Sequence, residues 1–192
     1  MQVTTIGLDL AKNVFQVHGV TEAGEIVFNR SLRRAQMHCF FENLPPCLVG
    51  IEACGTSHYW AREIAKLGHE VRLIPPAYVK PYVKRGKSDA IDAAGICEAV
   101  TRPSMRFVAV KSPEQQAVLA LHRVRDLIVR QRTQIVNMLR GVLAELGIVV
   151  REGAGHAIAF AKRCLEGSEQ AMPDLARDIV TNLSHQLVAL HR

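Results

Sequence analysis

Hydrophobic and polar positions alternate along the first 32 residues in a pattern that predicts strands. Towards the end of residues 3–10, apolar side chains alternate with Gly7 and Asp9, as they do in a strand with one buried face. Residues 13–20 and 25–32 are further strand candidates, and the turn between them contains Gly24, which adopts positive φ freely. We therefore expect a three-stranded meander at the start of the fold.

Helical and extended patterns alternate over the next part of the chain, which predicts an α/β fold. A short helix at 34–44 ends at Pro45, and the apolar segment 47–53 has the character of a central strand covered on both faces. The predicted elements that follow are a helix at 57–67 ending at Gly68, a strand at 69–74, a helix at 88–101 with Ser88 as its N-cap, and a short extended segment at 106–110.

After Pro113 the composition changes and predicts helices. Residues 114–146 contain no proline and a single glycine, so we expect one long helix with apolar residues near the seam positions of a coiled coil. These seam residues are Leu121, Val124, Ile128, Ile135, Met138 and Val142. The seam either forms a dimer or packs against the second of two later helices, which are expected at 156–166 and 173–192 beyond a glycine break.

Two parts of the chain are predicted from this change of pattern. Residues 1–110 form a domain that contains the sheet, and residues 111–192 form a helical region for dimerisation. An apolar stripe from Leu175 to Leu190 runs on to the last residue without a capping signal. We therefore expect the chain to be truncated before a further domain.

Charge and cysteine usage narrow the functional class. The net charge is +6 and the isoelectric point is about 9.3, a balance that favours a polyanionic partner such as nucleic acid. The five cysteines form no C-x-x-C pair, which indicates free thiols in a reducing compartment rather than a zinc site. Neither a signal peptide nor a membrane span is apparent in the sequence, so we expect a bacterial cytoplasmic protein.

Four acidic residues stand out against this background. Asp9 and Glu52 interrupt otherwise apolar strands, where a carboxylate is costly to bury unless it meets a cation. Asp89 and Asp92 are three residues apart at the start of a helix and so share one face. Asp89 also has a simpler interpretation as a first-turn acid that interacts favourably with the helix dipole.

A metal site is the chemistry that these four carboxylates predict if they converge. Like charges at one point raise one another's pKa, and Mg²⁺, for which Mn²⁺ can substitute, prefers carboxylate and water oxygens. Two such ions about 4 Å apart activate the attacking oxygen and stabilise the leaving oxygen of a phosphoryl displacement. We therefore predict that Asp9, Glu52, Asp89 and Asp92 are both metal ligands and catalytic residues.

Basic residues in two segments are candidates for nucleic-acid contact. Lys84, Arg85 and Lys87 lie just before Asp89 in a stretch that also contains tyrosines, whose rings either stack on unpaired bases or pack on the sheet. Arg123 and Arg130 belong to a series of arginines on the long helix. The alternative is that all of these residues are merely solvated.

The three segments that contain the acids, taken in order, resemble the DEDD signature of one transposase family. They are GLDLAK at 7–12, GIEACG at 50–55 and KSDAIDA at 87–93. The resemblance is to the IS110 family with its IS1111 branch, which is related to the Piv and MooV invertases, and it covers roughly residues 1–150. It implies a RuvC-like, ribonuclease-H-type mixed sheet with flanking helices, followed by a long-helix coiled-coil region.

The resemblance also implies a function. Members of this family are DNA transposases that recombine insertion-sequence DNA as oligomers guided by a bridge RNA, and Asp9, Glu52, Asp89 and Asp92 would hold Mg²⁺. Their nucleophilic serine belongs to a second, C-terminal domain, and no serine of this chain matches its motif. Complete recombination is therefore not expected from these 192 residues alone.

Three other functions remain as alternatives. The chain could bind nucleic acid or oligomerise without catalysis, or it could be a stand-alone nuclease that resembles a Holliday-junction resolvase. An ATPase or sugar-kinase-like domain also begins with a strand bearing an aspartate. That class needs a Gly-Thr phosphate loop after the aspartate, where this sequence has Leu10-Ala11-Lys12.

Overall fold

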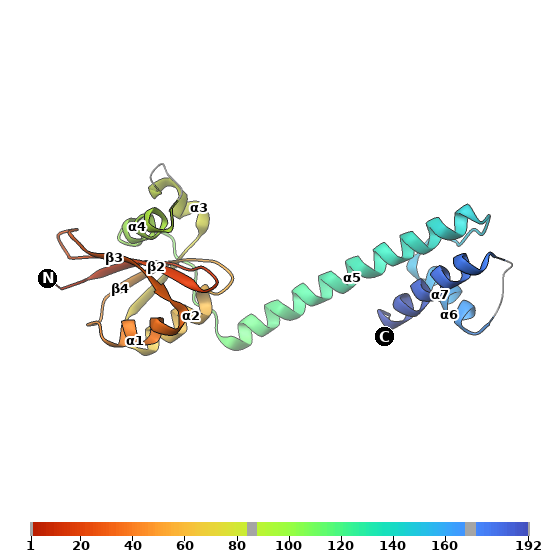
Figure 1. The fold of residues 1–192 in the computed structure, drawn as a ribbon, viewed down its shortest axis with the longest axis horizontal. Helices are drawn as coiled ribbons and strands as arrows, with labels where there is room; N and C mark the ends of the chain where they lie inside the picture. Colours follow the sequence, from red (N-terminus) through yellow and green to blue (C-terminus); the bar gives the residue numbers. More distant parts are fainter. Residues whose placement is uncertain (1, 84–87, 168–171, 192) are drawn as a thin grey trace. The chain divides into compact units, whose positions relative to one another are not determined.

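The computed structural model describes residues 2–83, 88–167 and 172–191 (Figure 1). The chain divides into two compact units, Met1–Gln116 and Ala117–Arg192. The division lies inside helix α5 (Pro113–Glu145), whose first residues belong to the first unit.

A five-stranded mixed sheet forms the centre of the first unit. Its strands are β1 (Thr5–Asp9), β2 (Val14–Val20), β3 (Ile26–Arg33), β4 (Leu48–Glu52) and β5 (Glu70–Ile74), in the order β3-β2-β1-β4-β5. The pairs β1–β2 and β2–β3 are antiparallel, as the predicted meander requires, whereas β1, β4 and β5 run parallel to one another. The predicted fold class, a mixed sheet with flanking helices followed by a long helix, is confirmed.

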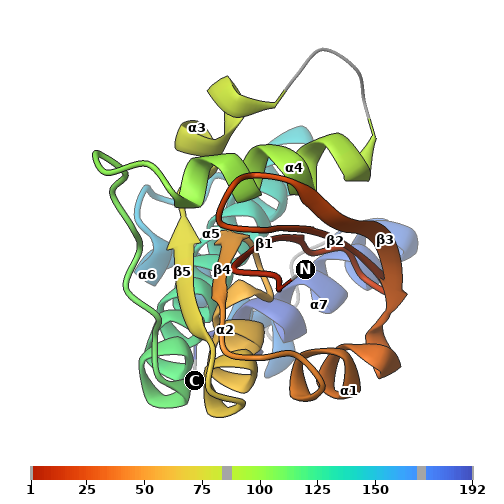
Figure 2. The same cartoon turned by 90° about the vertical axis from the view of Figure 1, so that its left-hand side faces the viewer.

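Helices cover both faces of this sheet (Figure 2). One face packs on α1 (Met37–Glu42) and α2 (Ser57–Lys66), which follow the short 3-10 helix η1 (Arg34–Gln36). The other face is next to α3 (Pro76–Val79), η2 (Lys80–Tyr82) and α4 (Asp89–Val100). The main apolar core lies on the first face, where Ile6, Leu8 and Phe15 are completely buried.

Two glycines bring α4 into close contact with the sheet. A Cβ atom at Gly7 would collide with the backbone of Ala93 and Cys97, and a Cβ atom at Gly50 would lie 2.7 Å from Cβ of Val100. Any side chain at either position would therefore force α4 away from the sheet. The packing also shows that Gly7 and Gly50 point towards α4.

Most elements of the first unit match the pattern of the sequence, and two do not. Ser88 accepts a hydrogen bond from the backbone nitrogen of Ile91 and caps α4, and Gly24 and Gly68 adopt positive φ, all as predicted. The helical turns of α3 and η2 were not predicted. Pro76 occupies the first turn of α3, where its missing N–H costs nothing.

The second unit is a packed arrangement of three helices. The end of α5 packs against α6 (Ala154–Leu165) and α7 (Asp174–Ala189), with Leu139, Leu143 and Leu187 completely buried. The buried stripe on α5 is one residue out of step with the predicted seam, because Leu139 is buried whereas Met138 is 59% exposed. The same helix therefore presents one apolar face to α6 and α7 and a different one to solvent.

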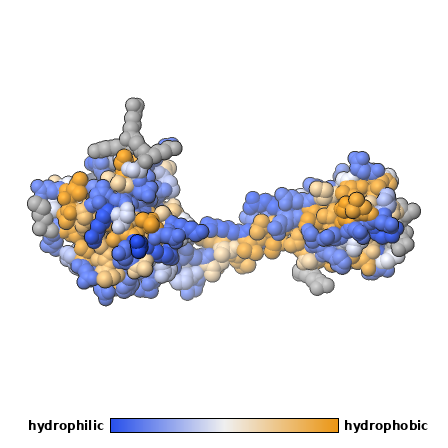
Figure 3. Space-filling model, in the orientation of Figure 1, coloured by the Kyte–Doolittle hydropathy of each residue, from blue (hydrophilic) through white to orange (hydrophobic). Residues whose placement is uncertain are grey.

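Apolar residues remain exposed on the earlier turns of α5. Leu121 is 67% exposed, Val124 51% and Ile128 38%, and residues of this character are visible along the helix in Figure 3. These three belong to the predicted seam, so that part of the seam has no partner within its own unit in the described residues. As a separate finding, none of the helices in the described ranges combines the length and the apolar character that a membrane crossing requires.

Candidate metal centre

The four predicted acids come from three elements that meet at one end of the sheet. Asp9 ends β1 and Glu52 ends the adjacent parallel strand β4, each one residue beyond the paired positions Leu8 and Ile51. Since alternate residues of a strand share a face, Asp9 and Glu52 lie on the same face as the glycines two residues before them, the face that α4 covers. Asp89 and Asp92 occupy the first turn of α4.

Three of the four carboxylates lie close together. Asp9, Asp89 and Asp92 can each offer one carboxylate oxygen such that all three oxygens lie within 4.8 Å of one another. Asp9 and Asp92 are half-buried and Asp89 is exposed. Glu52 is not in this group of three, but its charge is close enough to act on that of Asp9 and to be affected by that of Asp92.

Burial and mutual repulsion raise the pKa of two of these acids. The pKa of Asp9 is raised from 3.8 to about 6, first by burial and then by the charges of Asp92, Asp89 and Glu52, against a small opposing effect of the Leu10 backbone N–H. Burial, followed by the charge of Asp92, also raises the pKa of Glu52. The ionised cluster is thus electrostatically unfavourable in the metal-free chain, and a cation would relieve the repulsion.

The donor set fits a hard divalent cation. Among the described residues, the ligand atoms that converge here are carboxylate oxygens, and Mg²⁺ and Mn²⁺ bind such oxygens together with water. The partial exposure of Asp89 and Asp92 leaves room for water and for a substrate oxygen. The carboxylates of β1 and α4 are therefore candidate ligands for such an ion.

The predicted basic contacts come from two segments of the chain. Lys84, Arg85 and Lys87 lie outside the described residues. Arg123 and Arg130 are exposed on α5, and Arg130 Nε donates a hydrogen bond to the backbone oxygen of Asp126 at 3.2 Å. Among the described residues, neither Arg123 nor Arg130 forms an ion pair.

Sequence reasoning missed a set of polar residues beside the cluster. Gln16 pairs with Asp9 across the strands, and His18 pairs with Gly7, so both side chains lie on the face that carries the acids. The signal was present in the segment 14–20, where polar residues alternate with Phe15 and Val17. Alternation alone does not tell which face of the sheet is the functional one.

A second missed group connects α2 to the start of α5. His58 Nδ1 accepts a hydrogen bond from the backbone nitrogen of Lys111 at 3.2 Å, and Lys111 Nζ lies 3.2 Å from His58 Nε2. Arg62 donates to Gln116 Oε1 at 2.8 Å. Burial and the charges of Lys111 and Arg62 lower the pKa of His58.

Comparison with known proteins adds a family to this geometry. A family model described as a transposase, of the DEDD type of IS110, matches residues 6–148. The chain is 51% identical over 191 residues to a "Probable family 20 transposase" of Pseudomonas aeruginosa, which covers 99% of this chain and 56% of the relative. It is 43% identical over 185 residues to the "Transposase for insertion sequence element IS1328" of Yersinia enterocolitica, with coverages of 96% and 54%.

Two further similarities are more limited in extent. The "Transposase for insertion sequence element IS1111A" of Coxiella burnetii is 43% identical over 152 residues, 79% of this chain and 42% of the relative. A structure of T. thermophilus RuvC in complex with a Holliday junction aligns with 56% of this chain and 100% of that chain, with a TM-score of 0.41 and 11% identity, too low to support any conclusion. The chain spans about half the length of the curated relatives it matches.

Proposed function

This chain belongs to the IS110 family of DEDD transposases, and from that premise we propose that it is the metal-dependent part of a DNA transposase. The proposed reaction is the cleavage of a phosphodiester bond at an insertion sequence, followed by transfer of the DNA strand. The convergence of Asp9, Asp89 and Asp92, with oxygens within 4.8 Å of one another, is the observation that supports it most directly.

Each acid has a proposed role in holding Mg²⁺. Asp9, Asp89 and Asp92 are the primary ligands. Glu52, at the end of the adjacent strand β4, completes the set. A pair of ions bound there would supply activation of the attacking oxygen and stabilisation of the leaving oxygen. Because two of the ligands belong to α4, the close packing of α4 on Gly7 and Gly50 keeps the ligands from different elements together.

The proposed partners are DNA, a guide RNA and further copies of the chain. Family membership supports DNA, and the net charge of +6 favours polyanions in general. Lys84, Arg85, Lys87, Arg123 and Arg130 are the proposed phosphate contacts. The bridge RNA and the serine nucleophile in a further domain remain predictions from the family resemblance.

Binding of Mn²⁺ to the 192-residue chain is the first test, because Mn²⁺ replaces Mg²⁺ and is detected by electron paramagnetic resonance. We expect Asp9→Asn and Asp92→Asn to weaken Mn²⁺ binding by more than about tenfold, since even supporting groups of metal sites contribute that much. Asp126→Asn, at an exposed acid of α5, is the matched control and should bind Mn²⁺ as the wild type does. Equal binding by all four proteins would refute the metal centre.

Strand cleavage by the full-length protein separates catalysis from mere binding. Asp9→Asn should abolish cleavage and strand transfer of insertion-sequence DNA, because the metal ligands are incomplete. Unchanged activity of that variant would favour a non-catalytic nucleic-acid-binding role for this part of the protein. Cleavage of four-way junctions by the 192-residue chain alone would instead favour a stand-alone nuclease.

A further inference from the structure

Polar side chains of β2 and β3 extend the face that carries the metal centre. Gln16 is paired with Asp9 on one side and Ser31 on the other, while His18 is paired with Gly7 and Asn29. Side chains of residues paired across strands project from the same face. The face that begins with Asp9 therefore continues as a row of neutral hydrogen-bonding groups towards the edge of the sheet.

Hydrogen bonds hold part of this row in place. Ser31 Oγ donates to Gln16 Oε1 at 2.8 Å, and Gln16 Nε2 donates to Asn29 Oδ1 at 2.6 Å. Gln16 is only 8% exposed, so its amide is fixed by these two bonds. With its oxygen engaged, Asn29 retains its amide nitrogen as a donor.

His18 is buried beside Asn29 with a polar atom that lacks a partner. The residue is 7% exposed, and in the described part of the chain no group hydrogen-bonds its buried Nδ1. Burial lowers the pKa of His18, so its ring is neutral and offers one donor and one acceptor. Buried polar atoms are nearly always paired, which indicates that a ligand group belongs next to this ring.

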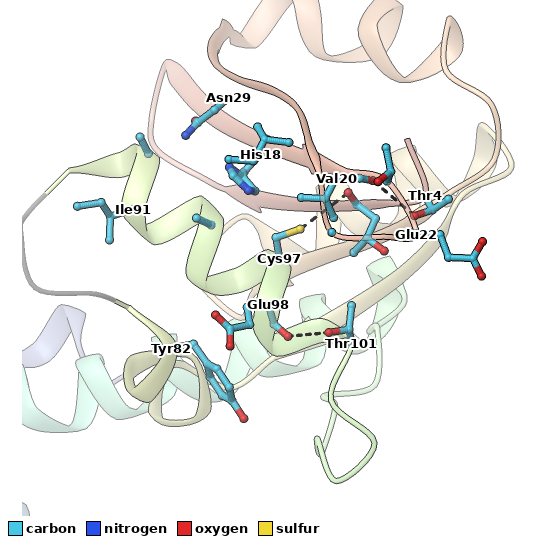
Figure 4. A pocket seen from close by; sticks show the side chains of 16 residues that line it. Thr4, His18, Val20, Glu22, Asn29, Tyr82, Ile91, Cys97, Glu98 and Thr101 are labelled. Atoms are coloured by element: carbon cyan, nitrogen blue, oxygen red, sulfur yellow. Dashed lines mark hydrogen bonds between the residues drawn. The ribbon is translucent and has the colours of Figure 1, made fainter. Parts of the chain in front are cut away.

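A groove of about 1030 Å³ lies between this row and α4, at the upper end of the size range of small-molecule sites. His18 and Asn29 line the strand wall, and Figure 4 shows them on neighbouring strands with Ile91 of α4 across the groove. Ala90 and Ala94 add small apolar surfaces to the helix wall. The groove thus places the hydrogen-bonding groups of His18 and Asn29 opposite the apolar side chains near the start of α4.

The charges around the groove exclude a phosphate as its preferred occupant. Among the described lining residues the charged ones are Glu22 and Glu98, and neither lysine nor arginine is present. A neutral, planar group with both donors and acceptors fits such a lining, as a nucleobase does when it is unstacked and placed in a pocket.

The position of α4 relates the groove to the metal centre. Asp89 and Asp92 approach Asp9, whereas Ala90, Ile91 and Ala94 line the groove, so one helix turn serves both. We infer that the groove between α4 and strands β2 and β3 binds an unpaired nucleobase of the nucleic-acid strand whose phosphate would be held by metal ions at the carboxylates. The inference rests on the proposed function for the identity of that strand.

Nuclear magnetic resonance of the histidine rings tests this inference directly. The 192-residue chain, free of divalent cations, is titrated with a short single-stranded DNA, with the same strand made abasic, and with inorganic phosphate. The His18 resonance, assigned from its loss in His18→Gln, should shift with the base-bearing strand and with neither of the other two probes. An equal shift of the His18 resonance with the abasic strand would overturn the inference. The inference would also be overturned if none of the three probes shifted this resonance.

Two variants distinguish the groove from the metal centre. Asn29→Ala, at an exposed position, should weaken binding of the base-bearing strand by about fivefold, the loss of one net hydrogen bond. His38→Ala, at an exposed histidine of α1, should not. Asp9→Asn should lose Mn²⁺ but still bind the base. If Mn²⁺ binding requires Asp9 and the bases make no difference, the groove assignment fails while the metal centre stands.

Discussion

At Asp9, the requirements of stability conflict with those of the proposed metal binding. This residue is half-buried at the end of an apolar strand, and its pKa of about 6 reflects burial and three neighbouring acids. Selection for stability alone would favour a neutral residue there. A carboxylate at this position is understandable if the protein gains a bound cation in return.

This conflict predicts how the stability of the metal-free chain depends on pH. Because the pKa of Asp9 is about 6 when folded and 3.8 ordinarily, the folded state holds the proton more tightly, and the free energy of unfolding falls as pH rises from about 4 to about 6. Glu52 contributes in the same direction. After allowance for solvent screening of a partly exposed group, we expect the loss to be about 1 kcal/mol.

Urea unfolding in the presence of a chelator measures this loss. Asp9→Asn should be more stable than the wild type at pH 8 and should lose that advantage at about pH 4, where Asp9 itself is neutral. A constant difference between the two proteins across this range would show that Asp9 is not under electrostatic strain.

At the scale of elements, the contact of α4 with the sheet decides whether the acids meet. Gly7→Ala places a Cβ atom against the backbone of Ala93 and Cys97. Because these are backbone atoms of a helix, the clash can be relieved only by a movement of α4. We expect a loss of about 3 kcal/mol in the free energy of unfolding, measured by denaturant titration, and weaker Mn²⁺ binding in any protein that still folds.

A second glycine provides the control for this substitution. Gly55→Ala adds the same methyl group at a loop position where nothing lies within 4 Å of the new Cβ atom. Its free energy of unfolding should lie within about 0.5 kcal/mol of the wild-type value, as is usual for surface substitutions. If Gly7→Ala behaved like Gly55→Ala, close packing of α4 would not be what assembles the centre.

Elements also show where the pattern of the sequence was sufficient. The strands, α2, α4 and the long helix were predicted because each has many residues with one consistent period and recognisable ends, such as Ser88 and Gly68. The turns at 76–82 were missed because four-residue and three-residue helices are too short to display a period. Pro76 is equally compatible with a loop and with a helix start.

For the whole molecule, the exposed seam of α5 predicts self-association. Leu121, Val124 and Ile128 repeat at heptad spacing and are exposed within their own unit, which is typical of a helix that pairs with another copy. The double variant Leu121→Glu with Val124→Glu should weaken the dimer on the order of 100-fold, because two apolar contacts are replaced by charges.

Sedimentation equilibrium checks this prediction, with a substitution at a residue next to the seam as the control. His122→Glu introduces a similar charge next to the seam but not on it, and should leave the dimer nearly unchanged. A wild-type chain that sediments as a monomer at every concentration would remove the proposed role of α5 in assembly.

What the sequence by itself determined was the identity of the acids and most of the elements that carry them. An acid inside an apolar strand, as at Asp9 and Glu52, is unusual enough to be recognised without a structure, and the order of three short motifs indicated the family. Signals of this kind can be recognised in the sequence alone, because hydrophobic periodicity, helix caps and turns depend on residues that are close in the chain.

Only the tertiary structure decided which residues share a space. Strand register placed Gln16 and His18 on the face of Asp9, the packing of α4 explained the glycines two residues before each strand acid, and the buried stripe of α5 proved to be one residue away from the predicted seam. Each of these outcomes depends on contacts between segments distant in the chain. Because a shift of one residue moves a side chain to the opposite face of a strand, such contacts follow from the packing of the whole fold rather than from any local pattern.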